Sequence, residues 1–492
     1  MQTHNSSRDR IASRIRLSPE DLAACRFGLA HAWPERSAAR RLTGAQIACG
    51  LLLLPAVAMV ARWAPAMLQA LLAAGWTLLF AAAIFLRVAS GALLLTRPAR
   101  PPPPWQGPLP VYTLLCPLFR EAEEVPRLLA ALAALDYPRH KLDIKLLLEA
   151  DDAPTIAAAR RHAPGHAELI LLAPCSPRTK PKALNAGLMR AHGRFITVYD
   201  AEDAPDSRQL LAALAAFQAG GSNLACVQAP LLIDNAHGSW LAAQFALEYA
   251  LQFQGLNPLL ARMGAAFPLG GTSNHFRTEA LRAAGGWDAF NVTEDADVGY
   301  RLVRDGWALG VIDPPTWEEA PLRLWPWLRQ RSRWIKGHVQ TLLVLLRRPR
   351  LLWRELGPRQ SVALAASLGL GLISSFAHGP LLLWTLWGLA SGAAPAWALA
   401  LSLAGMAAAG LAGLAVAARR RSLRLAWATL SMAAYWPLAS VAAVMALWSF
   451  CVRPFHWAKT RHGFRSARKP QRLRLLWTPP AARRDRAQLS SD

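Results

Sequence analysis

Long apolar runs on both sides of a more polar middle section constrain the fold of this chain more than any other feature. Two runs, at residues 43–61 and 65–86, precede that section, and three follow it, at residues 361–389, 396–418 and 425–452. Each run reaches the roughly 20 residues that an α-helix needs to cross a bilayer. The pattern therefore predicts a membrane protein whose middle section folds as a separate domain between two groups of transmembrane helices.

Positive charge collects beside these runs. The chain holds 55 Lys and Arg against 31 Asp and Glu, a net charge of +24, together with 53% hydrophobic residues and 20 Trp. A soluble nucleic-acid-binding protein would not combine a basic surface with so much apolar sequence, whereas the cytoplasmic flanks of membrane helices collect Lys and Arg. We therefore expect a lipid bilayer as a partner, no nucleic acid, and a cytoplasmic location for the leader 1–42, the middle section and the tail 453–492.

The basic tail conflicts with the number of apolar runs. Three spans after a cytoplasmic domain would leave the tail outside the cell, whereas its charge predicts that it stays inside. Two solutions remain open. Either one long run is broken into shorter pieces, with residues 374–380 as the expected break, or one piece lies in the membrane interface.

Strand-like and helix-like stretches alternate between residues 111 and 313. The strand-like stretches are 111–116, 142–149, 168–172 and 195–199, and the helix-like stretches are 125–135, 183–191 and 206–219. Such alternation predicts an α/β sandwich with a mostly parallel sheet. Ligands of these sheets bind beyond the carboxyl ends of the strands, which is where the acidic residues of this section cluster.

The sequence VYDAEDAPD at residues 198–206 places Asp200, Glu202 and Asp203 directly after the last of these strands. Carboxylates so close together repel one another, and a hard divalent cation, which prefers oxygen ligands, would relieve that repulsion. A diphosphate is the usual ligand for the open positions of such a cation. The alternative is an acidic, solvated turn, so the prediction of a metal site depends on the motifs around it.

Two motifs fall near other strand ends. Asp151 and Asp152 follow the strand 142–149 and either cap the next helix or accept hydrogen bonds from a nucleoside. Lys180 and Lys182 open a helix, where they are either solvated or bind a phosphate with help from the helix dipole. Each pair thus has a structural and a functional interpretation.

A denser group of motifs lies between residues 267 and 302. Gly270 and Gly271 allow a ligand to approach the backbone closely, although paired glycines also occur in ordinary turns. Glu294 and Asp295 follow Thr293 at the start of an amphipathic helix. The helix dipole alone favours acids there, and the alternative is a carboxylate that deprotonates an acceptor hydroxyl.

Residues 325–348, WPWLRQRSRWIKGHVQTLLVLLRR, interleave tryptophans with basic residues. A basic, aromatic helix of this kind typically lies in the membrane interface. Its segment QRSRW, at residues 330–334, contains Gln330, Arg333 and Trp334.

Taken in order, DD at 151–152, DAED at 200–203, TED at 293–295 and QRSRW at 330–334 resemble the D, D-x-D, T/E-D and Q-x-x-R-W pattern of membrane-embedded family 2 glycosyltransferases. This group includes cellulose, hyaluronan and chitin synthases. The chain looks most like a bacterial branch that carries EADD, VYDAEDxP, GGTSNHFR, NVTEDAD and RQRSRWIKG. The resemblance covers residues 110–341, and the ordered set is far more specific than any one motif.

The resemblance implies a GT-A fold, a nucleotide-diphosphate sugar donor, Mg²⁺ or Mn²⁺ as cofactor, and inversion at the anomeric carbon. Asp295 is implied as the general base, beside Glu294. Donor binding is implied for Asp151, Asp152, Lys182 and Asp200. The metal is implied for Asp200 with Glu202 or Asp203, and the acceptor and donor site for Gln330, Arg333, Trp334, Gly271 and Thr272.

Two departures from the family pattern leave roles open. Glu202 stands where the family has its second Asp, so the choice between Glu202 and Asp203 as metal ligand is undecided. Arg120 stands where the first motif usually has Asn, which leaves the nucleoside contacts of that loop undecided.

The resulting prediction is a multi-pass enzyme of the bacterial inner membrane with a cytoplasmic catalytic domain. It would transfer a sugar, with glucose as the first candidate, from a UDP-sugar to a growing β-linked polysaccharide, with accessory export subunits as candidate partners. The alternatives are non-processive transfer to a lipid or another membrane acceptor, and a catalytically silent scaffold. The predicted segments are a leader 1–42, a transmembrane hairpin 43–96, a Pro-rich linker 97–110, a GT-A domain 111–320, an interface helix 321–350, a transmembrane region 351–452 and a tail 453–492.

Overall fold

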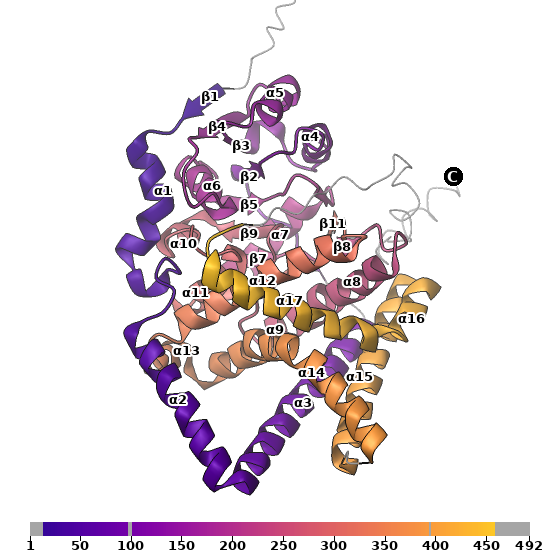
Figure 1. The fold of residues 1–492 in the computed structure, drawn as a ribbon. Helices are drawn as coiled ribbons and strands as arrows, with labels where there is room; N and C mark the ends of the chain where they lie inside the picture. Colours follow the sequence, from indigo (N-terminus) through magenta and orange to yellow (C-terminus); the bar gives the residue numbers. More distant parts are fainter. Residues whose placement is uncertain (1–12, 97–100, 393–394, 458–492) are drawn as a thin grey trace, which may run out of the picture.

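The computed structural model describes residues 13–96, 101–392 and 395–457. At its centre is an α/β domain, and long apolar helices extend from one side of that domain (Figure 1). Within the predicted linker, residues 101–110 form no helix or strand, and residues 97–100 lie outside the described residues. Most of the predicted tail also lies outside them.

An eight-stranded sheet forms the centre of the domain. Its strands are β1 (Ser13–Arg16), β2 (Tyr112–Leu118), β3 (Leu142–Glu149), β4 (Glu168–Leu172), β5 (Phe195–Val198), β7 (Leu224–Gln228), β9 (Asn274–Arg277) and β10 (Ala308–Val311), in the order β1-β4-β3-β2-β5-β9-β7-β10. Only β9 is antiparallel to its neighbours, β5 and β7, so the predicted mostly parallel sheet is confirmed. A second, small sheet contains β6 (Ala204–Pro205), β8 (Leu231–Ile233) and β11 (Thr316–Glu318).

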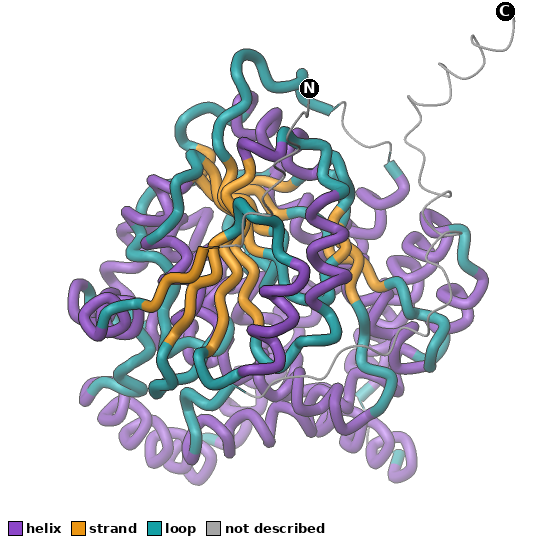
Figure 2. The backbone as a smooth tube through the Cα atoms, turned by 90° about the horizontal axis from the view of Figure 1, so that it is seen from above, coloured by secondary structure: helices purple, strands orange, loops and turns teal. Residues whose placement is uncertain are grey.

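Helices surround the strands, as the view from above shows (Figure 2). They are α4 (Val125–Ala133), α5 (Ala153–His162), α6 (Lys180–Met189), α7 (Gln209–Ala219), α8 (Trp240–Ala250), α9 (Asn257–Arg262), α10 (Thr278–Ala283), α11 (Glu294–Arg304) and α12 (Leu324–Leu345). The strand sequences are nearly continuous apolar runs because both faces of the sheet are covered. Leu114 and Leu115, for example, are both fully buried but belong to different hydrophobic clusters, since successive strand residues point to opposite faces.

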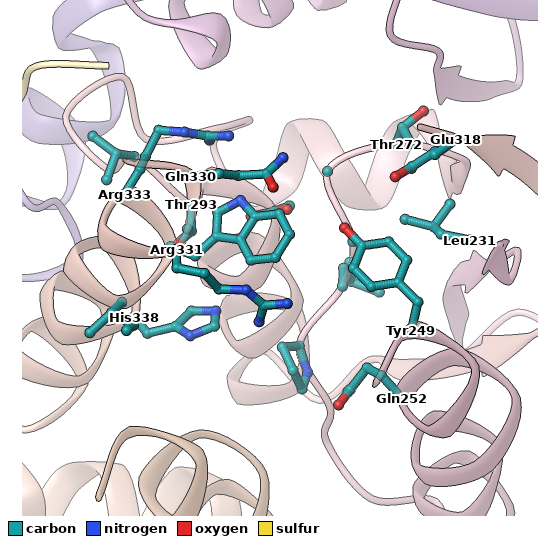
Figure 3. Close-up of a pocket in the computed structure, with 18 of the residues that line it drawn as sticks. Leu231, Tyr249, Gln252, Thr272, Thr293, Glu318, Gln330, Arg331, Arg333 and His338 are labelled. Carbon is teal, nitrogen blue, oxygen red and sulfur yellow. The ribbon is translucent and has the colours of Figure 1, made fainter. Parts of the chain in front are cut away.

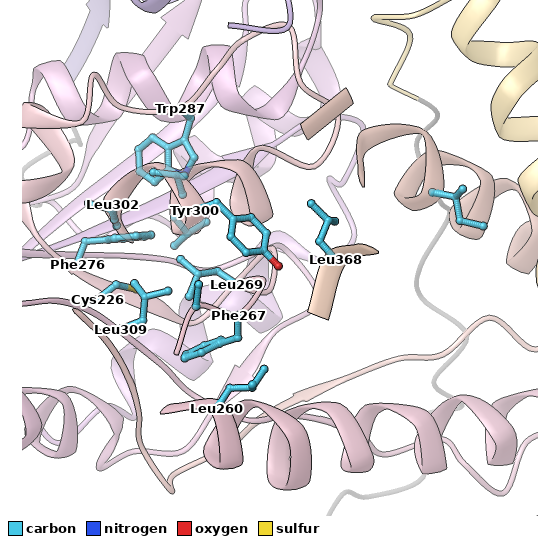
Figure 4. Packing of buried hydrophobic residues seen from close by; sticks show 14 of the residues in the cluster. Cys226, Leu260, Phe267, Leu269, Phe276, Trp287, Tyr300, Leu302, Leu309 and Leu368 are labelled. Carbon is cyan, nitrogen blue, oxygen red and sulfur yellow. The ribbon is translucent and has the colours of Figure 1, made fainter. Parts of the chain in front are cut away.

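One of these clusters lies beneath the motifs of residues 267–302. Phe267, Leu269, Phe276, Trp287 and Tyr300 pack together in it (Figure 4), and all five are at most 4% exposed. The cluster joins β9 to the first helical turns that carry Glu294 and Asp295. It therefore fixes the position of those acids relative to the sheet.

The N-terminal leader is part of the domain rather than a free extension. Its predicted short helix is α1 (Pro19–Ala32), which contacts α6, and Ser18 caps it by accepting a hydrogen bond from the Asp21 amide. The strand β1, which the sequence did not predict, adds to β4 in parallel. Downstream, the Ser37 hydroxyl donates to the buried carboxylate of Asp288.

Five helical segments in the described residues are long and apolar enough to cross a membrane: Gly44–Trp63, Pro65–Leu95, Pro349–Ser391, Ala396–Arg420 and Met432–Val452. The first two are α2 and α3, which form the predicted hairpin. The third contains α13 (Pro349–Leu364), a π-helical turn (Ala365–Gly369) and α14 (Leu370–Ser391), and the others are α15 (Ala396–Arg420) and α17 (Met432–Val452).

The expected break at residues 374–380 is wrong. Helix α14 instead continues through Pro380, which removes the amide that would bond the Phe376 carbonyl oxygen. The Ser440 hydroxyl of α17 bridges this turn: it accepts a hydrogen bond from the Gly379 amide at 2.8 Å and donates to the Ser375 carbonyl oxygen at 2.8 Å, with Phe376 O at 3.4 Å. The irregularity lies upstream, at the π-helical turn and at Gly357, whose φ is +69°.

The last apolar run is also divided. The short helix α16 (Leu423–Thr429) precedes α17. Helix α17 packs against α12 and runs beside it across the view in Figure 1. Helices α3 and α15 instead extend away from the sheet (Figure 1). This arrangement favours the interface alternative for α17. It leaves four helical segments that extend away from the domain, an even number that agrees with the charge of the tail.

Candidate active site

A cavity of about 570 Å³ joins the sheet to the membrane helices. At one end it is lined by Asp200, Glu202, Gly271, Glu294 and Asp295, and its middle is lined by α8 and α12. At the other end it is lined by residues of α3, α14 and α17. The predicted catalytic carboxylates and the membrane helices therefore share one space.

Asp200, directly after β5, lies beside a lysine that the sequence left undecided. The Lys180 ammonium donates to Asp200 Oδ2 at 2.7 Å and to the Gly271 carbonyl oxygen at 2.6 Å. Burial alone would lower the pKa of Lys180, but the carboxylates of Asp200, Glu294 and Asp295 outweigh it and raise that pKa. Lys180 is therefore charged and faces the cavity.

Lys182, by contrast, does not line the cavity. Its side chain is fully buried and its ammonium donates to Glu149 Oε1 at 2.7 Å. Lys180 rather than Lys182 therefore lines the cavity, because the two side chains leave α6 in different directions, and the role of Lys182 in phosphate binding stays a prediction. The choice between them could not be made from the motif TKPKALNAGL, since both lysines lie in its first turn.

The three carboxylates of VYDAEDAPD separate in the fold. Asp200 and Glu202 line the cavity, whereas Asp203 is 1% exposed and lies behind it. Asp203 accepts hydrogen bonds from the Asp200 amide at 2.6 Å and from the Thr272 hydroxyl, and burial, together with Glu318 and Asp200, raises its pKa. Asp203 and Thr272 thus fasten the turn after β5 to the loop after Gly271.

No group of three His, Cys, Asp or Glu side chains in the described part of the chain is arranged as a complete metal site. Two cavity-facing carboxylates nevertheless fit the way Mg²⁺ is usually bound with nucleotides, through one or two protein carboxylates and the phosphates of the substrate. Asp200 and Glu202 provide such a pair.

Glu294 and Asp295 begin α11, with Thr293 at the N-cap position. Burial and the neighbouring Asp295 raise the pKa of Glu294 to about 7, and burial raises the pKa of Asp295. A Cβ on Gly271 would lie 3.3 Å from Asp295 Oδ2, so the glycine leaves room beside this carboxylate. A carboxylate with a raised pKa that faces a cavity is suited to accept a proton.

Helix α12 places the QRSRW residues along the middle of the cavity. Gln330 is 7% exposed, and among the described residues neither its Oε1 atom nor Arg333 Nε has a hydrogen-bond partner. Trp334 packs against Tyr249 with ring centroids 6.1 Å apart. Gln330 and Arg333 face Tyr249 and Thr272 from the other side of the cavity (Figure 3). Unused polar atoms in this position are available to a ligand.

Arg331, which the sequence suggested only for the membrane interface, is instead a buried link between helices. It forms a bidentate ion pair with Glu248 of α8, and the Tyr435 hydroxyl of α17 donates to the same carboxylate at 2.8 Å. The link holds α12 between α8 and α17. Its partners, Glu248 and Tyr435, are far away in the sequence and no local pattern identified them.

The predicted nucleoside-binding aspartates do not line the cavity. Asp152 is the N-cap of α5 and also accepts a hydrogen bond from the Arg120 amide at 2.5 Å, which is the structural alternative that the sequence left open. Asp151 is half-exposed and pairs with Arg178 at 2.8 Å. Arg178 does line the cavity, so Asp151 contacts a cavity-lining residue without lining the cavity itself.

Comparison with known proteins agrees with this geometry. Residues 110–337 match the family model described as glycosyltransferase like family 2. The chain is 27% identical over 259 residues to the β-monoglucosyldiacylglycerol synthase of Trichormus variabilis, covering 51% of this chain and 54% of that protein. It is 24% identical over 241 residues to a probable glucomannan 4-β-mannosyltransferase of Oryza sativa, covering 47% of this chain and 41% of that protein. The chain thus spans about half the length of the curated relatives it matches.

Among solved structures, the mannosyltransferase PcManGT from Pyrobaculum calidifontis, in complex with GDP-Man and Mn²⁺, is similar with a TM-score of 0.48 and 20% identity, covering 76% of this chain and 99% of that one. The expected α/β domain of the GT-A type is present, with apolar helices before and after it. Residues 110–337 carry a glycosyltransferase family 2 domain.

Proposed function

We propose that this protein transfers a sugar from a nucleotide-diphosphate sugar to a hydroxyl group of a membrane lipid. The observation that carries the proposal is the single cavity that has Asp295 at one end and the apolar helices α3, α14 and α17 at the other. A lipid in such a cavity can place its head group beside the carboxylate while its chains stay among the helices. The similarity to lipid glucosyltransferases supports the same acceptor class.

The donor diphosphate would lie beside Asp200 and Glu202, which would hold Mg²⁺ or Mn²⁺. When bound, the cation would neutralise charge that develops on the leaving diphosphate. Lys180 contributes a second positive charge at the same place, since its ammonium already contacts Asp200. Asp203 would hold the turn in shape without touching the cation, so we propose Glu202 as the second ligand, a choice supported by its position in the cavity lining.

Asp295 would act as the general base. Its carboxylate would take the proton of the acceptor hydroxyl as that oxygen attacks the anomeric carbon, while the bond to the diphosphate breaks on the opposite face and the configuration inverts. The raised pKa of Asp295 strengthens it as a base. Glu294 beside it would favour a proton on one of the two carboxyl groups through mutual repulsion.

Gln330, Arg333 and Trp334 would contact the sugar and the acceptor from α12. The unused Gln330 Oε1 can accept a hydrogen bond from a sugar hydroxyl, and Arg333 can donate to a phosphate. The Trp334 ring offers an apolar wall on which a sugar face can rest. Gly271 and Thr272 would shape the opposite wall, where the missing Cβ of Gly271 leaves room for the reacting groups.

A direct test uses the purified full-length protein with radiolabelled UDP-glucose, Mg²⁺ or Mn²⁺, and either diacylglycerol or a phospholipid as acceptor. The proposal expects label in the organic phase as a lipid that carries one sugar. Label only in free glucose, or label only in a water-soluble polymer, would contradict a lipid acceptor.

A growing β-linked polysaccharide is the second candidate acceptor. The observation that favours it is the aromatic lining of the cavity by Tyr249, Trp334 and Trp436, because sugar rings stack on such side chains. The glucomannan mannosyltransferases among the relatives fit this acceptor. Product length separates the two candidates, and a polymer product would also call for a search for export subunits.

We further propose that the catalytic domain faces the cytoplasm of a bacterial cell. The arginines at residues 419–421 support this orientation. They lie at the end of α15 that is near the domain, where the Arg420 guanidinium lies over the Trp317 ring. Placing α17 in the interface brings the basic tail to the same side. Protease accessibility in sealed vesicles tests the orientation.

A further inference from the structure

Arg87 is a cation in the membrane part of the cavity. It belongs to α3, eight residues before Leu95, which corresponds to about 12 Å below the end of the helix from which the chain enters the catalytic domain. Its side chain lines the cavity together with His378 of α14 and Trp436 of α17. The guanidinium lies over the Trp436 ring, 4.9 Å from the ring centroid.

Within the described residues, Arg87 forms no hydrogen bond and no salt bridge. Three cations elsewhere in the described residues are each paired with a carboxylate: Lys182 with Glu149, Arg301 with Asp297, and Arg331 with Glu248. Two others, Arg277 and Lys336, are hydrogen-bonded to carbonyl oxygens. A charged group inside a membrane helix is costly unless a partner compensates it. The contact with Trp436 contributes only part of that compensation. The partner of Arg87 is therefore expected to be a ligand.

An ordinary explanation is that Arg87 belongs to the positive flank of α3 and extends toward the lipid head groups. Arg62 in α2 provides a comparison for that behaviour, because it also lies over a tryptophan, Trp63, at 5.4 Å, but is exposed on the outside of the helix pair. Arg87 instead points into the cavity that holds Asp295. The position of its side chain favours a binding role.

We propose that Arg87 binds the phosphate group of an anionic lipid and that this lipid is the sugar acceptor, an inference that rests on the proposed function and makes the acceptor more specific. A guanidinium offers a planar pair of donors that matches a phosphate. Leu86, Leu368, Met432 and Ala439 line the same end of the cavity and provide an apolar surface for the acyl chains. Diacylglycerol carries no charge, so it would offer Arg87 no anionic partner.

Lipid binding to the purified full-length protein tests the site without any sugar transfer. The probes are phosphatidylglycerol, an anionic lipid whose head group carries free hydroxyls, and diacylglycerol with identical acyl chains, and the readout is the Kd of each. The wild-type protein is expected to bind phosphatidylglycerol at least tenfold more tightly than diacylglycerol. Arg87→Gln is expected to remove that preference and leave diacylglycerol binding unchanged, whereas Arg87→Lys keeps part of it.

Arg62→Gln is the matched control, since it removes a cation that also lies over a tryptophan but outside the cavity. It is expected to keep the full preference. The proposal is overturned if Arg87→Gln weakens both lipids equally, which would indicate a packing role, or if the preference survives in Arg87→Gln. It is also overturned if inorganic phosphate displaces phosphatidylglycerol at equal concentration, because the site would then take a free ion.

The transfer assay separates this inference from the proposed function. If phosphatidylglycerol binds through Arg87 but no lipid is glycosylated, the phosphate site stands as a binding site, whereas the proposed function and the acceptor role are wrong. If phosphatidylglycerol and diacylglycerol are glycosylated equally well by the wild type and by Arg87→Gln, the proposed function stands and the inference is wrong.

Discussion

The two ends of the cavity differ in whether their cations have anionic partners. At the sheet, Lys180 is in contact with Asp200, and the acids Glu294 and Asp295 lie close enough to raise its pKa, so opposite charges compensate one another before any ligand binds. At the other end, Arg87 lies beside Trp436 and His378, and no carboxylate among the described residues pairs with it. In the proposed reaction, the fixed charges of the first end need little rearrangement when the transition state forms. In the proposed lipid site, the unpaired charge of the second end binds the phosphate.

Asp295→Asn, at the sheet end of the cavity, is expected to cause the largest loss of turnover. Removal of the base is expected to lower turnover by about 10²–10⁴-fold, the usual contribution of a positioned proton acceptor, while UDP-glucose and lipid affinities stay within about threefold. Turnover with labelled donor and calorimetric donor binding check this. Asp305→Asn, beyond the other end of α11, is the control and is expected to keep wild-type turnover. Near wild-type turnover in Asp295→Asn would rule out the assigned base.

The two lysines of α6 are expected to differ in effect, Lys180 on kinetics and Lys182 on stability. Lys180→Met is expected to lower kcat/KM by about 10²-fold with an unchanged melting temperature, because an electrostatic contact to the donor is lost. Lys182→Met removes the hydrogen-bonded partner of the buried Glu149, which keeps only the 3.6 Å contact to Arg178, and is expected to cost up to about 3–5 kcal/mol of stability. Thermal unfolding and kinetics of both variants check the pair. The reverse pattern would show that Lys182 is the phosphate ligand.

Trp334→Ala acts where the two ends meet. Loss of the aromatic wall is expected to raise the acceptor KM by about tenfold, equivalent to about 1.4 kcal/mol of binding, with little effect on the donor KM. Trp353→Ala is the control, because that ring is 54% exposed on α13, outside the cavity. An equal rise in the KM of donor and acceptor would mean that Trp334 shapes the whole cavity.

Glu294 gives the smallest expected effect, on the pH dependence of stability. Its pKa in the folded protein is about 7 instead of 4.5, so deprotonation is harder in the folded than in the unfolded chain. The resulting cost is absent below pH 4.5, grows between 4.5 and 7, and is constant above 7. Glu294→Gln should therefore gain stability relative to the wild type as pH rises through this window, by a shift of a few °C in melting temperature at most. A pH-independent difference in melting temperature would contradict the assignment.

Local sequence predicted the central fold well. Strands β3 and β4 have the predicted bounds, and α4, α6 and α7 lie where apolar periodicity predicted helices. These elements are defined by short-range patterns, in which buried strands and amphipathic helices leave distinct periods. The addition of β1 to β4 was not predicted, because four residues of an Arg-rich leader carry too little pattern to show which edge of a sheet they join.

The arrangement of the apolar helices was predicted only in part. The hairpin α2–α3 follows directly from length and hydropathy. The position of α17 beside α12 does not, since a helix of 21 apolar residues can span a bilayer or lie against another helix. Contacts between distant segments decide between these outcomes, as the Ser440 hydroxyl does for the continuity of α14.

By itself, the sequence determined which chemical groups this protein has available. The carboxylates Asp200, Glu202 and Asp295 and the polar residues of QRSRW stand in an order that predicted an α/β domain with a shared site, and they do line one cavity. The tertiary structure decided which member of each pair faces it: Lys180 rather than Lys182, and Glu202 rather than Asp203. Residues that are neighbours in sequence point in different directions at a turn or a helix start, and only packing against the rest of the chain fixes those directions. The same packing placed Arg87 of α3 in the cavity that Asp200 and Asp295 line, a position that no local pattern predicted.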